Sequence, residues 1–575
     1  MAGTANRCDR FLIMKRQTFQ TPYHGKDFTI PIIFTVLASF LIFLSYRSVW
    51  NVFYLNDEWL QLGLVYAEGL FAGLRHYSLL ELLAGRGRPI GTLINNLFMY
   101  YAPLSVWPFI TFGLITHCIN TVLVYWIMYI LTRSQRTSFV SGIFFALSNV
   151  TFQTFAWPAS TVQTSGSLMF LLISTLSAIS YIWTLRFNRA VLAVLSFYVA
   201  FLIKDSSVYM ILVFPILLLL FGKSKKISMN VMYFVIPFLA FGIFRSGIFS
   251  NTGIEVMMRS IRMYLINCAV FPIISLPHFL IPSRFMFRMA ESFGKIFYPF
   301  LLSSDASAML PKVTEYILSD MVSLYLGFTM LFGLSALYMY RKERRPAILF
   351  AVCFYVASLI PSIVYLNQRG SSYIESRYLY HSIVGISLLA GIVFDTLLIA
   401  VRKIHGVNRY VCTYIIIAAT CLFFLKQISI IQREVNAVVL QSNDIKHVMY
   451  EIKRVKPTLQ QNPIIYLDGD RNYYFYHSLK VPFQIGPGHM LALLYYSQDN
   501  ISKDVLINMP FWKIDSQGYS ESEGKGFGYY WDINVLIEQF RIDQRLNTGQ
   551  LIGLYYNSQE GKIYDITEKI QSMIK

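Results

Sequence analysis

The sequence is short of charged residues, and acidic residues are especially few. Only 14% of its 575 residues are charged, and 31 acidic residues stand against 49 basic ones. A soluble globular domain carries about a quarter charged residues. With 55% hydrophobic residues and a mean hydropathy of +0.49, the chain is not expected to dissolve as one compact body. Intrinsic disorder, which requires low hydrophobicity, is also excluded.

Cysteine is equally scarce, and the sequence has no internal repeat or low-complexity tract. The cysteines are too scattered for a disulfide framework, and none has the spacing of metal ligands. We interpret them as membrane thiols. A collagen-like chain and a disulfide-stapled secreted module are therefore excluded. The cysteines are Cys8, Cys118, Cys268, Cys353, Cys412 and Cys421.

Long apolar runs and aromatic residues are abundant instead. An aromatic share of 16% suits a protein with two membrane interfaces and a cleft that faces sugar or lipid. Apolar runs of about 18 to 25 residues predict membrane-spanning helices. We place about eleven spans near 28–46, 105–131, 138–157, 165–185, 190–203, 207–222, 229–248, 321–340, 347–366, 380–401 and 409–428.

The positions of the basic residues explain most of the net charge of +18, which by itself could suggest a nucleic-acid partner. Lys and Arg concentrate in the cytoplasmic loops of membrane proteins, and these residues fall on one side of the expected spans. We therefore expect no nucleic-acid partner. The residues are Arg7, Arg10, Lys15, Arg16, Lys26, Arg133, Arg136, Arg186, Arg189, Lys223, Lys225, Lys226, Arg341, Lys342, Arg344, Arg345, Arg402, Lys403 and Arg409.

This orientation predicts how the chain is divided. Residues 1–27 form a cytoplasmic segment that lacks the features of a cleavable signal. A transmembrane domain covers 28–429, with external loops at 47–104 and 249–320. An odd number of spans places 430–575 outside the cytoplasm.

The C-terminal part differs in composition and predicts a small α/β domain. Strand-like runs lie at 463–469, 504–509 and 551–557, between helix-like segments at 435–455 and 533–545. The predicted fold class is thus a polytopic all-α membrane protein with a small extracytoplasmic α/β domain.

The first external loop carries an adjacent carboxylate pair, Asp57 and Glu58, directly after the first span. Carboxylates at a helix start favour a capping role. A fixed carboxylate beside a dry cleft could equally deprotonate an acceptor hydroxyl. Later in this loop, Arg86 is typical of an interfacial arginine, whereas Arg88, fixed before Pro89, is better placed to bind a phosphate.

Polar residues within the second and third spans are further candidates. His117 and Asn120 share a helical face, where they could form an interhelical hydrogen bond or line a site. Gln153, Trp157 and Gln163 could line a sugar site, with Trp157 stacking on a pyranose, or Trp157 could belong to an aromatic belt.

Two more clusters lie further along the chain. The spans 190–203 and 207–222 are short and meet at Lys204 and Asp205, which predicts two half-length helices meeting at a polar turn. The segment LNQRGSSYIESRYLYHSIVG brings Arg377 and other polar residues to the outer end of the span at 380–401. Its cations could neutralise a lipid-borne phosphate or form a plain interfacial cluster.

These motifs together resemble the GT-C superfamily of membrane glycosyltransferases. The superfamily pattern is similar to three features of this chain: the carboxylate pair after the first span, the RP later in the same loop, and the segment FGLITHCINTVLVYWI. FLIKDSSVYMILVFPILLLL resembles the half-helix pair of the protein O-mannosyltransferase-like and TMTC-type branches, and SRYLYHSIVGISLLAGI resembles their "RYLYLPS" segment. The resemblance covers about residues 28 to 400.

The resemblance implies a GT-C fold and transfer of one sugar, with inversion, from a polyprenyl-phosphate carrier to a hydroxyl acceptor. The acceptor would be a glycan, a lipid or a protein, and the chain would lie among membrane lipids. By this resemblance, Asp57 matches the family's catalytic acid position, and Glu58 is its neighbour. Arg88 matches the arginine of the family's RP motif. Lys204 and Asp205 match its KE motif, and Arg377 and Tyr378 match its RY motif.

One departure concerns the stretch after Trp157. Related branches carry an arginine and an acid there, but this chain reads PASTVQTSGS. Asp205 is then the expected substitute acid. Gln153, Trp157 and His117 remain candidates for lining the sugar or acceptor site. No cofactor and no metal are expected.

In the expected mechanism, Asp57 is the general base, and Arg88, Lys204 and Arg377 stabilise the leaving phosphate. A secondary transporter or lipid flippase is the alternative, since broken helices mark transport sites; a non-catalytic scaffold is a third possibility. We expect an integral membrane protein of a prokaryotic plasma (inner) membrane rather than of the ER, although both fit.

Overall fold

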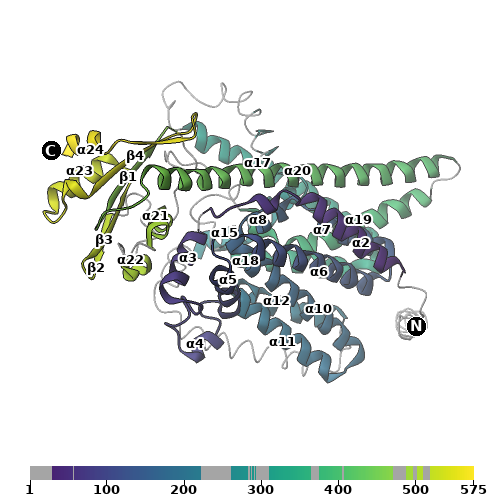
Figure 1. The fold of residues 1–575 in the computed structure, drawn as a ribbon. Coiled ribbons are helices and arrows are strands. Elements are labelled where there is room, and N and C mark those ends of the chain that lie inside the picture. Colours follow the sequence, from purple (N-terminus) through teal and green to yellow (C-terminus); the bar gives the residue numbers. More distant parts are fainter. Residues whose placement is uncertain are drawn as a thin grey trace, which may run out of the picture.

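The structure is a computed structural model in which helices dominate and one small sheet lies near the C-terminus (Figure 1). It describes residues 29–55, 57–221, 261–282, 285–286, 288–289, 292, 310–363, 375–403, 407–470, 487–496, 502–508 and 518–574.

The membrane part is a bundle of apolar helices. Six helical stretches of the described chain are long and apolar enough to cross a membrane, or seven if the bent pair Gln135–Ala146 and Asn149–Ala156 forms one span. The chain is therefore an integral membrane protein. The bundle helices are α2 (Thr29–Ser45), α6 (Trp107–Thr132), α7 (Gln135–Ala146), α8 (Phe152–Ala156), α9 (Pro158–Thr161), α10 (Ser167–Thr184), α11 (Phe187–Ile203), α12 (Met210–Phe221), α15 (Ile261–Ser275), α17 (Leu310–Tyr340), α18 (Arg345–Ile363), α19 (Ile383–Arg402) and α20 (Val407–Val455).

Each expected span coincides with helix, except 229–248, which lies outside the described residues. Several of these helices, α2, α11 and α12 among them, are shorter than a full span. The loop expected at 249–320 also contains an apolar helix, α15, which packs against α17 and α18.

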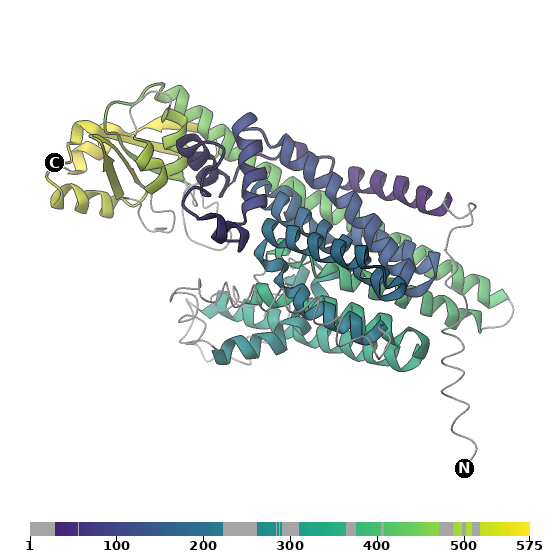
Figure 2. The ribbon, with the colours of Figure 1, turned by 90° about the horizontal axis from the view of Figure 1, so that it is seen from below.

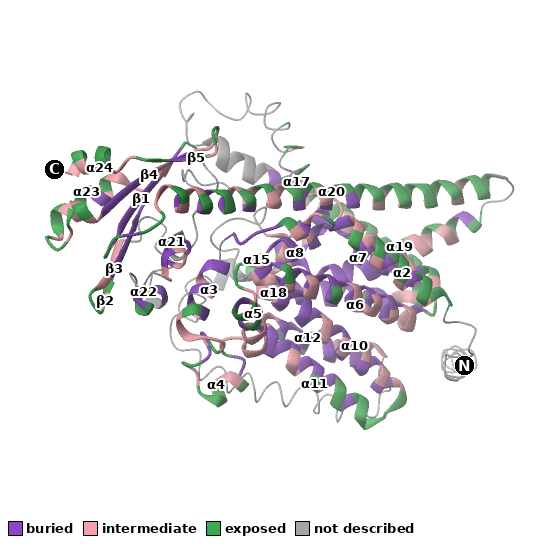
Figure 3. Ribbon diagram, viewed as in Figure 1, coloured by how far each residue is buried: buried purple, intermediate pink, exposed green. Residues whose placement is uncertain are grey.

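Small residues let the bundle helices approach closely, as is common between helices in membranes. Gly391 of α19 lies so near α7 that a Cβ there would be 2.5 Å from the carbonyl oxygen of Thr137. Buried side chains gather between the helices, and the outer surfaces of α19 and α20 are exposed (Figure 3).

The expected loop 47–104 folds into three helices, α3 (Asp57–Glu68), α4 (Leu79–Leu83) and α5 (Pro89–Tyr101). Helix α4 begins with a capping box in which Ser78 and Glu81 hydrogen-bond reciprocally to each other's backbone amide. The bonds that the Glu81 carboxylate accepts, first from the Ser78 amide and then from the Ser78 hydroxyl, lower the pKa of this carboxyl.

Helix α20 connects the bundle to the C-terminal domain without a break. It is 49 residues long and runs from the far end of the bundle to the sheet (Figures 1 and 2). The segments 409–428 and 435–455, expected as a span and a separate helix, are therefore one element, and the domain boundary predicted near 430 lies inside it.

The C-terminal domain is built on a five-stranded sheet in the order β2-β3-β1-β4-β5. Strand β1 pairs in parallel with β3 and β4, and the outer strands β2 and β5 are antiparallel to their neighbours. The strands are β1 (Ile464–Gly469), β2 (Gly518–Ser522), β3 (Lys525–Tyr530), β4 (Leu551–Asn557) and β5 (Lys562–Asp565).

Helices cover both faces of this sheet, because its strands alternate between two apolar cores. Ile464 and Tyr466 pack with Leu536 and Ile570 of the helices α23 (Ile533–Ile542) and α24 (Thr567–Ile574). On the other face, the core includes residues of α20, α21 (Pro487–Tyr496) and α22 (Lys503–Asn508). The predicted small α/β domain is confirmed.

One strand prediction within this domain was wrong. Within the run expected as a strand at 504–509, residues 504–508 belong to helix α22. The start of this helix is held by a hydrogen bond from the Asp504 amide to the Ser502 hydroxyl, 3.3 Å long. Val505 and Leu506 are both buried although they are adjacent. The short apolar run thus fits a strand and a buried helix equally well.

Candidate functional site

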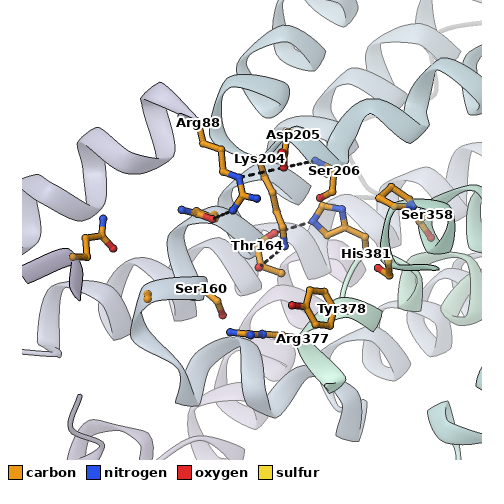
Figure 4. Close-up of a pocket in the computed structure, with 15 residues that line it drawn as sticks. Arg88, Ser160, Thr164, Lys204, Asp205, Ser206, Ser358, Arg377, Tyr378 and His381 are labelled. Atoms are coloured by element: carbon orange, nitrogen blue, oxygen red, sulfur yellow. Dashed lines mark hydrogen bonds and ion pairs between the residues drawn. The ribbon is translucent and has the colours of Figure 1, made fainter. Parts of the chain in front are cut away.

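A cavity of about 260 Å³ lies where the segment between α2 and α6 meets the break between α11 and α12 (Figure 4). Elements far apart in the sequence contribute to its wall: α3, the start of α5, α9, the end of α18 and the segment before α19. The lining residues are Gln61, Arg88, Ala159, Ser160, Gln163, Thr164, Lys204, Asp205, Ser206, Ser358, Pro361, Ser362, Arg377, Tyr378 and His381.

Arg88 projects into this cavity from a constrained backbone. It directly precedes α5 in the left-handed conformation (φ 51°), with Pro89 as the first helical residue. Non-glycine residues rarely adopt this conformation, and those that do cluster at functional sites. Its guanidinium Nη1 donates to Gln163 Oε1 at 2.9 Å, and its Nε lies 3.2 Å from Asp205 Oδ1.

Arg86, by contrast, is not among the cavity residues. It forms an ion pair with Glu81 of α4 and lies 5.1 Å from the centre of the Tyr77 ring. The two arginines thus lie in different surroundings, and binding of a phosphate by Arg88 remains a prediction.

Lys204 and Asp205 form the polar break that the sequence predicts. Helix α11 ends at Ile203, Lys204 is extended, and a 3₁₀ turn over Asp205–Tyr209 leads into α12. Lys204 Nζ donates to the Thr164 hydroxyl at 2.9 Å, and Asp205 Oδ1 accepts from the Ser206 amide at 2.9 Å.

Thr164 and Gln163 reach the cavity through a local irregularity of the chain between α9 and α10. They belong to a π-helical turn, Val162–Gly166, just before α10. Such turns widen a helix by one residue and are frequent at functional sites. Hydrogen bonds from Arg88 and Lys204 end on these two side chains.

Arg377 supplies a third cation from the 3₁₀ turn Ser376–Leu379. Its guanidinium carbon lies 3.9 Å from the centre of the Trp157 ring and 5.3 Å from that of Tyr378. Nη2 is 2.5 Å from Glu375 Oε2. The aromatic contacts and the ion pair fix this arginine at the cavity wall.

The charges on the cavity wall are unequal. Arg88, Lys204 and Arg377 line it, and Asp205 is the one carboxylate among the lining residues that the structure describes. A site of this composition attracts an anion with several acceptor oxygens, such as a phosphate.

Of the candidates for lining a sugar or acceptor site, Gln163 lines this cavity, whereas Trp157, Gln153 and His117 are not among its lining residues. Trp157 is buried against Arg377, and Gln153 Oε1 accepts from the Arg377 amide at 3.3 Å. His117 is fully buried between helices, where Nδ1 is 2.9 Å from the Tyr380 hydroxyl and Nε2 is 3.1 Å from the Ala146 carbonyl. Asn120 donates to the same hydroxyl at 3.3 Å. His117 and Asn120 thus form interhelical hydrogen bonds.

The first turn of α3, which contains Asp57 and Glu58, lies at the edge of the site. Glu58 is fully buried and accepts from the Ala159 amide at 3.0 Å. Asp57 is the first residue of α3, and its side chain lies outside the described residues. Gln61, which lines the cavity, is four residues further on and therefore lies one helical turn from Asp57.

Sequence reasoning named Gln163 but missed other hydroxyl and amide groups of the cavity, Gln61, Ser358 and Ser362 among them. The spacing of Gln61 from Asp57 could have identified it, because both lie on one helical face. Ser358 and Ser362 gave no signal, since serine is common in apolar helices, and they reach the cavity through the position of α18 alone.

Within the described part of the chain, no three His, Cys, Asp or Glu side chains are grouped so that they could hold a metal ion. Metal-independent transfer remains a prediction. The described cysteines are free thiols, as expected: Cys118, Cys268, Cys353, Cys412 and Cys421.

No protein-family model and no curated protein sequence matches the chain. Several solved structures are similar, and two of them come from Archaeoglobus fulgidus. One is the oligosaccharyltransferase of Archaeoglobus fulgidus in its apo form, at 10% identity and a TM-score of 0.41; the match covers 77% of this chain and 62% of that one, so this chain spans less than two thirds of it. The other is the archaeal oligosaccharyltransferase AglB from A. fulgidus in complex with an inhibitory peptide and a dolichol-phosphate. Its identity and TM-score are the same, and the match covers 93% of this chain and 74% of that one.

Proposed function

We propose that this chain is a GT-C-type membrane glycosyltransferase. It moves a monosaccharide from a polyprenyl-phosphate donor to a hydroxyl acceptor on the extracytoplasmic face. The observation that carries this proposal is the single cavity lined by Arg88, Lys204 and Arg377 beside the start of α3. The motifs that place these residues are those that resemble the GT-C superfamily.

The three cations suit the leaving group of such a reaction. Cleavage of the sugar–phosphate bond leaves the electron pair and an additional negative charge on the phosphate. Fixed cations in a site shielded from water stabilise this developing charge without reorganising. Arg88 and Arg377 are held by their neighbours, and Lys204 is tied to Thr164.

Asp57 is the general base in this proposal. It accepts the acceptor's hydroxyl proton as the acceptor oxygen bonds to the anomeric carbon and the polyprenyl phosphate departs from the opposite face. The anomeric configuration is inverted in this single displacement. Asp205, expected as a substitute acid, is assigned instead to orienting Arg88, because their side chains form an ion pair.

The test is transfer by the purified full-length chain in liposomes. A panel of radiolabelled polyprenyl-phosphate sugars is offered with glycan, lipid and peptide acceptors. We expect labelled acceptor and released polyprenyl phosphate, and a loss of about 10²–10⁴-fold for Asp57→Asn, as for removal of a general base. Arg88→Gln should weaken the use of donor, whereas Arg86→Gln, outside the cavity, should stay within about twofold of the unmodified chain, as for a surface substitution.

Two results would contradict the proposal. One is the absence of transfer from every donor by a folded chain that still binds polyprenyl phosphate. The other is an Asp57→Asn protein with undiminished activity, which would remove Asp57 from the mechanism while leaving the donor site intact.

A lipid flippase or secondary transporter is the second candidate, favoured by the polar break at Lys204 and Asp205 between α11 and α12. Broken helices form ion and substrate sites in transporters. Movement of a labelled lipid-linked sugar across proteoliposomes, without formation of a new glycosidic bond, would support this function over the first.

A further inference from the structure

Glu58 is a carboxylate with no exposed surface. Burying such a group is costly unless hydrogen bonds replace its hydration. Its two oxygens are engaged separately: Oε1 accepts from the Ala159 amide at 3.0 Å, and Oε2 accepts from the Leu55 amide at 3.3 Å. Both donors are backbone groups, which cannot move away as a flexible side chain could.

The two amides belong to distant parts of the chain. Leu55 lies in the extended stretch between the first helix and α3, whereas Ala159 lies in α9 and contributes to the cavity wall. The link from Glu58 to Ala159 spans 101 residues of sequence. It fixes the first turn of α3 to the cavity wall.

The same residue of α9 is also held from α5. Asn95, fully buried, donates from Nδ2 to the Ala159 carbonyl at 3.1 Å. The Ala159 residue is therefore bound at its amide by α3 and at its carbonyl by α5. Gln61 reinforces this arrangement by donating to Asn96 Oδ1 at 3.2 Å.

We infer that Glu58 is a positioning residue, which sets the place of the neighbouring Asp57 relative to the cavity, and that it takes no proton from the acceptor. This inference rests on the proposed function. Its physical basis is that the Glu58 oxygens accept hydrogen bonds from fixed amides, and a general base must instead be free to accept the proton of its substrate. Displacing a reacting group by about 1 Å can cost about 100-fold in rate.

The experiment compares the full-length chain with Glu58→Gln, in which one oxygen becomes an NH₂ group that cannot accept from an amide. We expect kcat to fall by about 10- to 100-fold and the donor KM to stay within twofold, because the cavity cations are unchanged. The acidic limb of the pH–rate profile should keep its midpoint, since Asp57 still carries the titration. Glu434→Gln, a buried carboxylate of α20, is the matched control.

Asn95→Ala provides a second, independent variant. Because Asn95 and Glu58 both hold Ala159, their effects on kcat should be non-additive in the double variant. Hydrogen exchange of the segment 152–166 should rise in both single variants. This measurement reports the loss of a hydrogen bond to Ala159 without any assay of activity.

Four outcomes separate the possibilities. If the acidic limb disappears in Glu58→Gln, or if exchange in 152–166 is unchanged in both variants, the inference is overturned. Additive losses would show that the two residues do not act through Ala159 and would also contradict it. If the unmodified chain transfers no sugar while exchange responds as expected, the proposed function has failed, and the assignment of Glu58 and Asn95 to holding Ala159 stands.

Discussion

At the scale of single residues, the ring of Trp157 packs against Arg377. The sequence left open a sugar-stacking tryptophan or an aromatic-belt residue, and in the structure the Arg377 guanidinium lies 3.9 Å from the ring centre. A cation–π contact removed from water contributes about 1–2 kcal/mol. We expect Trp157→Leu to reduce transfer by roughly tenfold, mainly through a higher donor KM, because Arg377 loses the face that orients it.

Trp157→Phe is the matched control for this prediction. Phenylalanine removes the indole but keeps an aromatic face, so it should retain most of the activity in the same liposome assay. Thermal unfolding of both variants checks that they fold. Equal losses of activity in Trp157→Leu and Trp157→Phe would show that the indole, and not its contact with Arg377, carries the role.

At the scale of secondary-structure elements, the cavity depends on how closely α5 approaches the end of α11. A Cβ added at Gly91 would lie 2.5 Å from the carbonyl oxygen of Ile203. Gly91→Ala must therefore push the two helices apart and separate Arg88 from Asp205. We expect about 1–3 kcal/mol of destabilisation, typical of overpacking, together with lower transfer.

Gly333→Ala is the control, since this glycine of α17 has no atom within 4 Å of the added Cβ. Replacing a helical glycine in open space stabilises a helix by about 0.5–1 kcal/mol. Unfolding temperatures in one detergent should then move in opposite directions for the two variants. A neutral Gly91→Ala would contradict the assigned approach of the helices.

These elements also show how far the sequence could predict the site. Hydropathy located the helices, and the cluster of charge at Lys204 and Asp205 located the break, because a polar pair is conspicuous in an apolar run. The π-helical turn that brings Gln163 and Thr164 into the cavity could not be predicted. It packs against α5, α6, α9, α10 and α11, and no residue type in PASTVQTSGS marks it.

At the scale of the whole molecule, helix α20 joins the C-terminal domain to the segment that carries the carboxylate pair. The Phe53 amide donates to the Ser442 hydroxyl at 3.0 Å across 389 residues of sequence, and both groups are buried. Lys446, one turn further along α20, lies 5.4 Å from the centre of the Phe53 ring. Helices α21 and α22 of the C-terminal domain also pack against α3. Helix α20 and the C-terminal domain thus contact both the stretch before α3 and α3 itself.

This arrangement predicts that Ser442→Ala acts on both stability and transfer. The substitution leaves the buried Phe53 amide without its acceptor, which costs about 1–3 kcal/mol, and it loosens the stretch that leads into Asp57.

Ser335→Ala is the control. The exposed Ser335 hydroxyl of α17 donates to the Leu331 carbonyl of its own helix, and changes of this kind alter the stability by no more than about 0.5 kcal/mol. We expect Ser442→Ala to lower the unfolding temperature, to raise hydrogen exchange over residues 50–62 and to reduce kcat with little change in donor KM. Unchanged exchange over that segment would show that α20 merely connects the two parts and does not hold the loop that begins α3.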